Sequence, residues 1–365
     1  MGLLDQMEQN FREKLNSLLA YFSRQSHMKL LTLGYLMVAV IFGLDYATGV
    51  ELTFSIFYLI PIFFVAWFVG KAAGAVISLM SAAAWLLADV LASPSHLHPI
   101  FSTWNTLGIF GFFLLFTFLL AGLQEAVQRE KRMARKIQLG LLPRQVPQIP
   151  GYEIATAWQP ADTVAGDYFD VLPLNEHALG LCIADVSGHG LPAALLMSNL
   201  QAAVKLLAAH NTDPAALCKK LNRLVCGNVA DGNFITFFYA LLDTESRSLV
   251  YVNAGHNQPI LLHRDGTWTR LDLGGIPLGL EANRQYQTGE IRLAAGDRLV
   301  LFTDGLIECT SFKEQAFGEQ RLLHLLREHR QLDAAGLKER VIRAAAEFCQ
   351  SRYSDDLTLV VLAVV

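Results

Sequence analysis

The chain has 365 residues, of which 53% are hydrophobic and 17% are charged, and its formal net charge is −4. This length predicts two or three domains, and the low charge, with one short basic stretch at 129–136, argues against nucleic-acid binding. The five cysteines are scattered without a CxxC pair, which argues against a disulfide framework or a zinc site and favours a reducing compartment.

Residues 1–28 are the first predicted element, an amphipathic helix on the inner face of a membrane and in contact with its lipid. No small-residue cleavage site follows a short apolar core, so we do not expect a signal peptide. A cytosolic helix that packs on a partner is the alternative. The apolar residues at helical spacing are Leu4, Met7, Phe11, Leu15, Leu18, Leu19 and Phe22.

The region 29–123 has few charges and predicts a transmembrane module of four helices, because each apolar segment approaches the roughly 20 residues that cross a bilayer. Lys and Arg flank the region on both sides, and Lys71 lies in the middle connection, whereas the two longer connections have neither. The positive-inside rule therefore places both termini in the cytoplasm of a multi-pass membrane protein. The apolar segments are about 30–49, 52–70, 72–92 and 101–123.

Polar residues gather near the predicted outer ends of these helices. They are compatible with a ligand- or proton-sensing site, or with side chains that rest at the membrane interface. The pattern over 45–70 loosely resembles membrane sensor modules of bacterial signalling proteins, which indicates the inner membrane of a bacterium. The central stretches of the spans carry no charge, so a transporter fits poorly. The polar residues are Asp45, Glu51, Asp89, His96 and His98.

The segment 124–142 is strongly polar and predicts a helical connector. Its apolar positions form a seam of two per heptad that only Glu130 interrupts, which favours pairing with a second copy of the chain in a homodimer. A solvated linker helix is the alternative. Pro143 ends the connector, and a new domain, 143–365, begins there. The seam consists of Leu123, Val127, Ala134, Ile137 and Leu141.

The domain 143–365 alternates short β-rich runs with helices, and its hairpin-like spacing predicts a mixed α/β fold with mainly antiparallel strands. We expect strands at 152–158, 168–173, 178–184, 235–242, 248–253, 258–263, 298–302 and 357–364. We expect helices at 191–209, 213–229, 319–329 and 333–350.

Four acids of this domain lie at predicted strand ends or in the adjoining turns. A single acid in such a turn is more often structural, but several carboxylates gathered in one place repel each other unless cations neutralise them. Ligand sets made only of oxygen suit Mg²⁺ or Mn²⁺ better than zinc. Together the four acids therefore predict a metal centre. They are Asp167, Asp185, Asp304 and Asp355.

Five motifs occur in an order that resembles the SpoIIE/RsbU-like branch of the PPM metal-dependent serine/threonine protein phosphatases. The similarity covers about 135–365 and implies a β-sandwich flanked by helices, with two divalent cations, Mn²⁺ or Mg²⁺, at one end. A metal-activated water would hydrolyse phosphoserine or phosphothreonine without a covalent phosphoenzyme. The motifs are Gly166–Asp170, Ala184–Gly190, Asn253–Asn257, Thr303–Glu308 and Asp355–Thr358.

The resemblance also implies roles for single residues. Asp185 would bridge both ions, and the Val186 backbone carbonyl would bind one of them. Asp304 and Asp355 would bind the other ion, and Asp167 would hold a metal or its waters. The neighbouring Asp356 is a less favoured ligand, because Asp355 occupies the leading position of the motif.

Two histidines stand within these motifs. Eukaryotic relatives carry a histidine directly after Asp-Gly, whereas His189 lies four positions beyond Asp185. We expect it to hold the loop, and catalytic proton donation beside Asp185 and Asp167 is the alternative. His256 is expected to be structural. Those relatives also place a phosphate-binding arginine before the first acid, where this chain has Asp162-Thr163.

The predicted function is that of a membrane-anchored phosphatase. The resemblance implies that its substrate is a phosphorylated STAS-type anti-sigma-factor antagonist or a similar regulator. We also expect the membrane module to control the phosphatase through the dimeric connector and the helix 191–209. The alternative is a catalytically silent phosphatase fold that docks a signalling partner. Retention of all four acids argues against that alternative.

Overall fold

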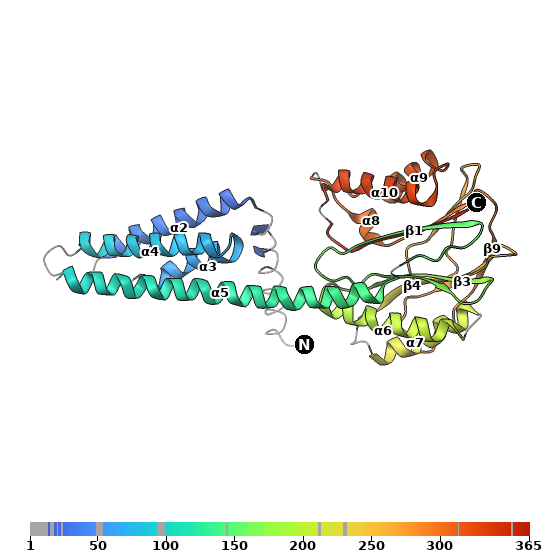
Figure 1. Ribbon diagram of the computed structural model, residues 1–365, viewed down its shortest axis with the longest axis horizontal. Coiled ribbons are helices and arrows are strands. Elements are labelled where there is room, and N and C mark those ends of the chain that lie inside the picture. The colour runs from blue at the N-terminus through green and yellow to red at the C-terminus, as the bar shows by residue number, and fades with distance from the viewer. Residues whose placement is uncertain are drawn as a thin grey trace. The chain divides into compact units, whose positions relative to one another are not determined.

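The computed structural model consists of two compact units, Met1–Glu130 and Lys131–Val365. Figure 1 shows both, with helices and strands labelled. The structure describes residues 14, 18–19, 21–22, 25–48, 54–92, 99–143, 145–210, 213–228, 232–312, 314–351 and 353–365. The predicted helix 1–28 therefore lies mostly outside the described residues, as do Glu51, His96 and His98.

The first unit is a bundle of apolar helices, as the sequence predicts. Three helices are long and apolar enough to cross a membrane, whereas the second predicted segment is shorter and forms one apolar helical stretch, Ser55–Phe68. A helix of the second unit also meets the length and composition criteria. The elements of the bundle are α2 (His27–Thr48), η2 (Ser55–Tyr58), α3 (Leu59–Phe68), α4 (Lys71–Ala92) and α5 (Pro99–Leu141).

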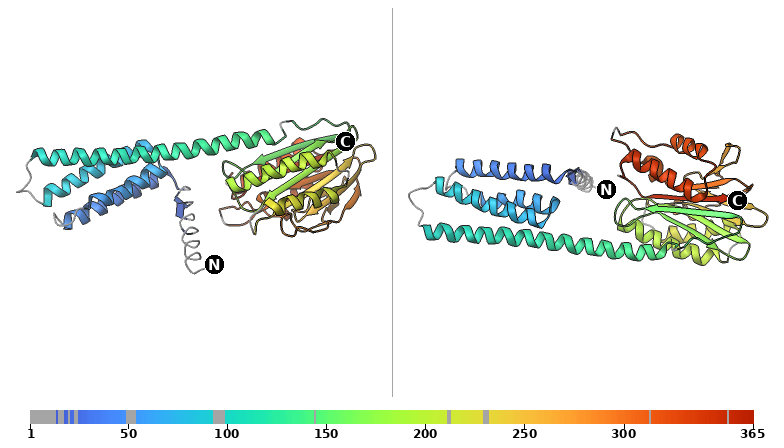
Figure 2. Two further views of the ribbon diagram at one scale, coloured as in Figure 1. Left: turned by 90° about the horizontal axis from the view of Figure 1, so that it is seen from below. Right: turned by 45° about the horizontal axis from the view of Figure 1, so that its top comes forward.

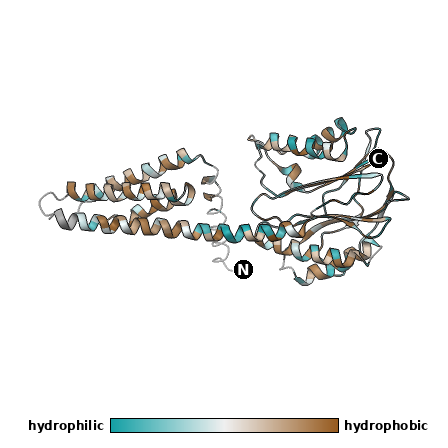
Figure 3. Cartoon of the chain, viewed as in Figure 1, coloured by the Kyte–Doolittle hydropathy of each residue, from teal (hydrophilic) through white to brown (hydrophobic). Residues whose placement is uncertain are grey.

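Small residues allow the helices of the bundle to approach closely. A Cβ atom at Gly74 would lie 2.8 Å from both the Ala66 and Thr117 side chains, so no larger residue fits there without a shift. The outward faces remain apolar, with Leu36, Leu79 and other leucines exposed. An apolar exterior around a packed interior is typical of a bundle surrounded by lipid, and Figure 3 shows this hydrophobic colouring along the helices.

The connector is not a separate helix. Helix α5 has 43 residues and runs without a break through the whole predicted connector to Leu141. Three apolar residues of the predicted seam, Leu123, Val127 and Ile137, are exposed on this helix. The last turns, from Lys131, belong to the second unit.

The second unit is a β-sandwich of two sheets, and the predicted α/β class is confirmed. One sheet has the order β1-β11-β10-β6-β7; the other has the order β2-β3-β4-β5-β8, with β9 beside β5. All pairs are antiparallel except β5 with β8. The strands are β1 (Tyr152–Gln159), β2 (Tyr168–Pro173), β3 (Ala178–Val186), β4 (Ile235–Asp243), β5 (Ser248–Ala254), β6 (Ile260–Leu262), β7 (Trp268–Arg270), β8 (Gly274–Gly275), β9 (Gly289–Arg292), β10 (Arg298–Phe302) and β11 (Leu357–Val364).

Helices cover the outer face of each sheet. Helices α6 and α7 pack on the sheet that contains β3 and β5, and α10 packs on β1 and β11 of the other sheet (Figures 1 and 2). Strand β11 is buried along its full length, because the sandwich core lies on one face and α10 on the other. The helices are α6 (Leu191–Ala208), α7 (Pro214–Asn228), α8 (Asp304–Glu308), α9 (Glu319–Glu328) and α10 (Ala334–Cys349).

Candidate metal centre

Strand pairing brings the four predicted acids to one end of the sandwich. In one sheet, β2 and β3 are antiparallel with Tyr168 opposite Ala184, so Asp167 and Asp185 lie at the same end. In the other sheet, Phe302 lies opposite Leu359, so the acids that closely follow β10 and precede β11 also share an end. These are Asp304 and Asp355.

Asp167 joins the two sheets. Its side chain is 1% exposed, and its Oδ2 accepts hydrogen bonds from Thr303 Oγ1 at 2.8 Å and Thr358 Oγ1 at 2.5 Å. Burial raises the pKa of this carboxyl well above its usual value, and the charge of Asp185 raises it further. The two threonines thus hold an acid from one sheet against strands of the other.

The negative charges of Asp185 and Asp304 repel each other. Burial raises the pKa of Asp185 to about 7, and the charges of Asp304 and Asp355 add to the shift. The pKa of Asp304 rises to about 6, again through burial first and then through Asp355. Groups that repel in this way are stabilised as carboxylates when a cation lies between them.

The donors therefore fit hard divalent cations, because all are oxygen atoms and they carry excess negative charge. Among the described residues, no three His, Cys, Asp or Glu side chains converge tightly enough to form a ready-made ligand cage. The charges of Asp304 and Asp355 nevertheless act on Asp185. Carboxylates that repel each other stand apart unless a cation draws them together.

The Val186 carbonyl lies beside the loop that carries Asp167. A Cβ atom at Gly166 would lie 3.1 Å from Val186 O and 3.2 Å from the Ala193 Cβ. Glycine at 166 therefore lets the backbone approach both the end of β3 and the first turn of α6. The predicted ligand carbonyl thus lies close to the acidic end.

Asp355 and Asp356 differ in what their carboxylates already bind. Asp356 is buried, and its two oxygens accept hydrogen bonds from Ala161 N at 2.8 Å and Gly166 N at 2.7 Å. Its carboxylate therefore fixes the loop before Asp167. Asp355 is only half-buried, and its Oδ1 accepts from Asp356 N at 2.8 Å. This difference favours Asp355 over Asp356 as a ligand.

The two histidines also differ. His189 is exposed in the turn between β3 and α6, where Gly188 and Gly190 both adopt positive φ. His256 is buried, and its Nδ1 lies 2.8 Å from Thr236 Oγ1, which itself donates to the Asp185 carbonyl at 3.4 Å. A structural role for His256 agrees with these contacts.

Burial also holds His256 in its neutral form. It lowers the pKa of His256 to about 3, although the Phe302 backbone opposes the shift. No described atom makes a hydrogen bond of acceptable geometry with Nε2.

Sequence reasoning missed several residues that shape this end of the sandwich. Glu308, at the end of α8, adds to the raised pKa values of Asp185 and Asp304. Its position in the Asp-Gly-Leu-Ile-Glu motif could have identified it as a site residue from the sequence. Thr303 and Thr358 also stood in quoted motifs, but their joint contact with Asp167 depends on the fold.

The last turns of α5 contact the same loop. Gln138 is buried and makes two hydrogen bonds to the backbone of Ala165, which directly precedes Gly166 and Asp167. Lys131 Nζ lies 2.9 Å from Asp162 Oδ2 at the start of this loop. The Leu141 carbonyl accepts from Gln201 Nε2 of α6 at 2.9 Å. The helix end thus fixes both the loop and α6.

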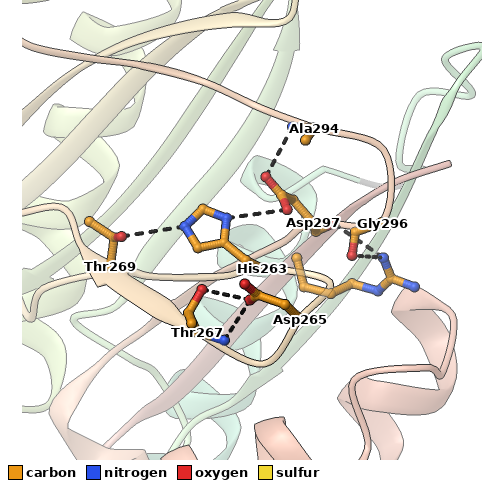
Figure 4. A network of polar contacts seen from close by, with 8 residues as sticks. His263, Asp265, Thr267, Thr269, Ala294, Gly296 and Asp297 are labelled. Atoms are coloured by element: carbon orange, nitrogen blue, oxygen red, sulfur yellow. Dashed lines mark hydrogen bonds and ion pairs between the residues drawn. The ribbon is translucent and has the colours of Figure 1, made fainter.

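A second polar network lies at the opposite end of β10. Figure 4 shows His263 between Asp297 and Thr269, with Nδ1 at 3.3 Å from Asp297 Oδ1 and Nε2 at 3.4 Å from Thr269 Oγ1. The buried Asp297 also accepts from Ala294 N at 2.9 Å. This network joins the β6–β7 hairpin to the turn before β10 and lies away from the acidic end.

Comparisons with known proteins agree with this geometry. The chain shares its fold with the SiaA-PP2C domain of Pseudomonas aeruginosa, with a TM-score of 0.60 and 24% identity over 67% of this chain and 100% of that one. It is 33% identical over 245 residues to phosphoserine phosphatase RsbU of Bacillus subtilis, which covers 67% of this chain and 72% of RsbU. Phosphoserine phosphatase RsbP of the same organism is 25% identical over 233 residues, with 63% of this chain and 56% of RsbP covered.

The fold is therefore that of a PP2C-type domain. The family model of stage II sporulation protein E (SpoIIE) matches residues 175–365. The chain belongs to the SpoIIE family, within the metal-dependent serine/threonine protein phosphatases. The predicted enzyme class, a protein-serine/threonine phosphatase, is confirmed.

Proposed function

We propose that the second unit removes phosphate from serine or threonine of a regulatory protein, with two divalent ions bound at the acidic end. Asp185 would bridge the ions, and the Val186 carbonyl would bind one of them. Asp304 and Asp355 would bind the other, and Asp167 would hold a metal or its waters. The observation that carries this proposal is the convergence of mutually repelling carboxylates from both sheets, with Asp167 buried and the others partly buried.

The chain's own residues fix this arrangement before any substrate arrives. Thr303 and Thr358 orient the Asp167 carboxylate, and Asp356 fixes the loop on its N-terminal side. Bound divalent cations would activate a water molecule and neutralise the phosphoryl oxygens. His189 is exposed in the turn after Asp185, where it would hold the loop or, as the alternative, donate a proton to the leaving serine oxygen.

The proposed substrate is a phosphorylated STAS-type anti-sigma-factor antagonist or a similar bacterial regulator. Support comes from the relatives, since RsbU and RsbP are both named phosphoserine phosphatases. The chain covers 72% of RsbU and 56% of RsbP.

We further propose that the first unit anchors the enzyme in the bacterial inner membrane with both termini in the cytoplasm. The long apolar helices and their exposed leucines support insertion. The orientation is supported by Lys29 and Lys71 at the starts of α2 and α4, and by the basic residues 129–136 in α5.

Control of the enzyme through α5 completes the proposal. The exposed apolar residues Leu123, Val127 and Ile137 support pairing of α5 with a second copy of the chain. A change in that pairing would reach the acidic end through Gln138 and Ala165. Replacing Ile137 with Glu should shift the full-length protein from dimer to monomer in light scattering, whereas Gln128→Glu, on the same helix, should not.

The catalytic proposal is tested by phosphate release from a phosphoserine STAS-domain protein by the full-length chain with Mn²⁺. The variant Asp185→Asn should lose at least about 100-fold in kcat/KM. Asp265→Asn, in the exposed β6–β7 turn, is the matched control and should retain full activity. If the wild-type chain binds the phosphoprotein but releases no phosphate, the binding-module alternative replaces the enzyme proposal.

A further inference from the structure

His256 lies in the segment that crosses from one sheet of the sandwich to the other. Strand β5 belongs to the sheet that contains β3, and β6 belongs to the sheet that contains β10. Because Ile260 of β6 lies opposite Val300 of the antiparallel strand β10, the residues before Ile260 run alongside the end of β10. The segment 255–259 therefore crosses between the sheets at the acidic end, where β3 and β10 both end.

The buried ring of His256 reaches the strand that pairs with Asp185. Its Nδ1 lies 2.8 Å from Thr236 Oγ1, and the same hydroxyl oxygen lies 3.4 Å from the Asp185 carbonyl oxygen. Thr236 lies directly opposite Asp185 in the pairing of β3 with β4. A single hydroxyl group thus separates the imidazole from the backbone of the proposed bridging acid.

The other sheet also contacts this ring. The backbone of Phe302, the last residue of β10, interacts with the imidazole of His256. Thr303 and Asp304 follow Phe302 directly in the chain. The imidazole therefore lies between the strand pair that carries Asp185 and the strand that leads to Asp304.

The backbone that carries His256 is held firmly. Its amide donates to Asn253 Oδ1 at 2.7 Å, and Asn253 Nδ2 donates to the Leu271 carbonyl at 3.1 Å. Gly255 has a φ of +70°, and a Cβ atom at this position would collide with Pro277, so the turn requires glycine. A buried side chain on such a turn has little freedom, and it can set the distance between the strands that it contacts.

An imidazole suits this position chemically. A neutral imidazole ring has one N–H donor and one nitrogen lone pair, so it can serve a hydroxyl group and a backbone group at the same time. Side chains that orient the ligands of a metal without touching the metal often govern its affinity, and their loss typically weakens binding by about 10–100-fold.

We propose that His256 is a positioning residue of the metal centre, which fixes the separation of Asp185 from Asp304 through its contacts with Thr236 and the end of β10. This inference rests on the proposed two-ion centre. It extends that proposal, because it assigns control of metal affinity to a side chain that is not itself a proposed ligand.

The experiment measures Mn²⁺ binding to the full-length protein by equilibrium dialysis, at a temperature well below unfolding. His256→Gln and Thr236→Val should each raise the Mn²⁺ dissociation constant by at least about 10-fold. The double variant should bind no more weakly than His256→Gln, because both substitutions remove the same contact. Thr236→Ser keeps the hydroxyl group and should retain the wild-type affinity.

His263→Gln is the matched control, because His263 also lies between an acid and a threonine, but at the opposite end of β10. It should keep the wild-type Mn²⁺ affinity even where it lowers the unfolding midpoint. Wild-type affinity in folded His256→Gln and Thr236→Val would overturn the positioning role alone. A wild-type chain that binds no Mn²⁺ would overturn the proposed two-ion centre and this inference with it. If His256→Gln does not fold, the comparison of Thr236→Val with Thr236→Ser decides.

Discussion

Gln138 and Ala165 are joined by two hydrogen bonds across 27 residues of sequence. Gln138 Nε2 donates to the Ala165 carbonyl at 2.6 Å, and its Oε1 accepts from the Ala165 amide at 3.0 Å. This pair connects the end of α5 to the residue that precedes Gly166 and Asp167. It links the connector helix directly to the loop that carries Asp167.

Removing this pair should weaken the proposed metal site. Gln138→Ala leaves the Ala165 amide and carbonyl without their partners, at a cost of about 1–3 kcal/mol, and frees the loop before Asp167. We expect a higher Mn²⁺ concentration for half-maximal phosphatase activity of the full-length enzyme. Gln128→Ala, an exposed glutamine on the same helix, should match the wild type. An unchanged Mn²⁺ dependence in Gln138→Ala would contradict a positioning role for the pair.

Substitutions of Asp355 and Asp356 should have different effects, because Asp355 is the proposed metal ligand and Asp356 is a structural acid. Asp356→Asn loses an acceptor for Ala161 N or Gly166 N and should destabilise the fold by about 1–3 kcal/mol. Asp355→Asn should retain its thermal stability without metal but lose Mn²⁺-dependent activity. Thermal unfolding in EDTA and phosphate release with Mn²⁺ measure the two effects. Equal destabilisation by both variants would argue against the assignment.

The neutral state of His256 predicts a pH dependence of stability. Its folded pKa, about 3, lies below the value of about 6.5 for an unfolded chain, so the unfolded state binds a proton first as the pH falls. The stability is complete above pH 6.5 and is lost progressively between pH 6.5 and 3. At pH 5.5 the loss should be roughly 1 kcal/mol relative to pH 8.

The variant His256→Gln isolates this contribution. Its unfolding midpoint should fall less steeply between pH 8 and 5.5 than that of the wild type, whatever its stability at pH 8. His324→Gln, an exposed histidine on α9, should follow the wild-type slope. Identical slopes for His256→Gln and the wild type would show that His256 does not titrate on unfolding in this range.

Asp297 should contribute to stability without affecting catalysis. It is buried and accepts from both His263 and Ala294 N, so Asp297→Ala leaves a buried amide unsatisfied and should cost about 1–3 kcal/mol. Its kcat/KM at a temperature well below unfolding should equal that of the wild type, because the network lies at the other end of β10. The exposed Asp265→Ala is the stability control. Loss of activity in folded Asp297→Ala would place this network in the catalytic machinery.

The sequence predicted the elements that have long buried runs. Strand β11 was evident from Leu357–Val364, which is apolar at nearly every position because both faces are covered. The short strands β7, β8 and β9 were missed, because two to four residues with mostly exposed side chains give no periodic signal. The five-residue helix α8 was missed for the same reason.

The acids of the candidate site could be predicted from the sequence, but the residues that hold them in place could not. Asp167, Asp185, Asp304 and Asp355 stood at strand ends in the sequence, so their convergence followed from strand pairing. The contact of Thr303 and Thr358 with Asp167 joins residues 136 and 191 positions apart, and no local pattern reveals it. The same holds for Gln138, which resembled any polar residue of a connector helix.

The number of Mn²⁺ ions bound per chain tests the central claim most directly. Equilibrium dialysis of the full-length protein with metal analysis should give two ions per chain, and fewer in Asp185→Asn, because that carboxylate is proposed to bridge both. Asp265→Asn should bind two. Binding of fewer than two ions by the wild type, or full binding by Asp185→Asn, would contradict the proposed two-ion centre.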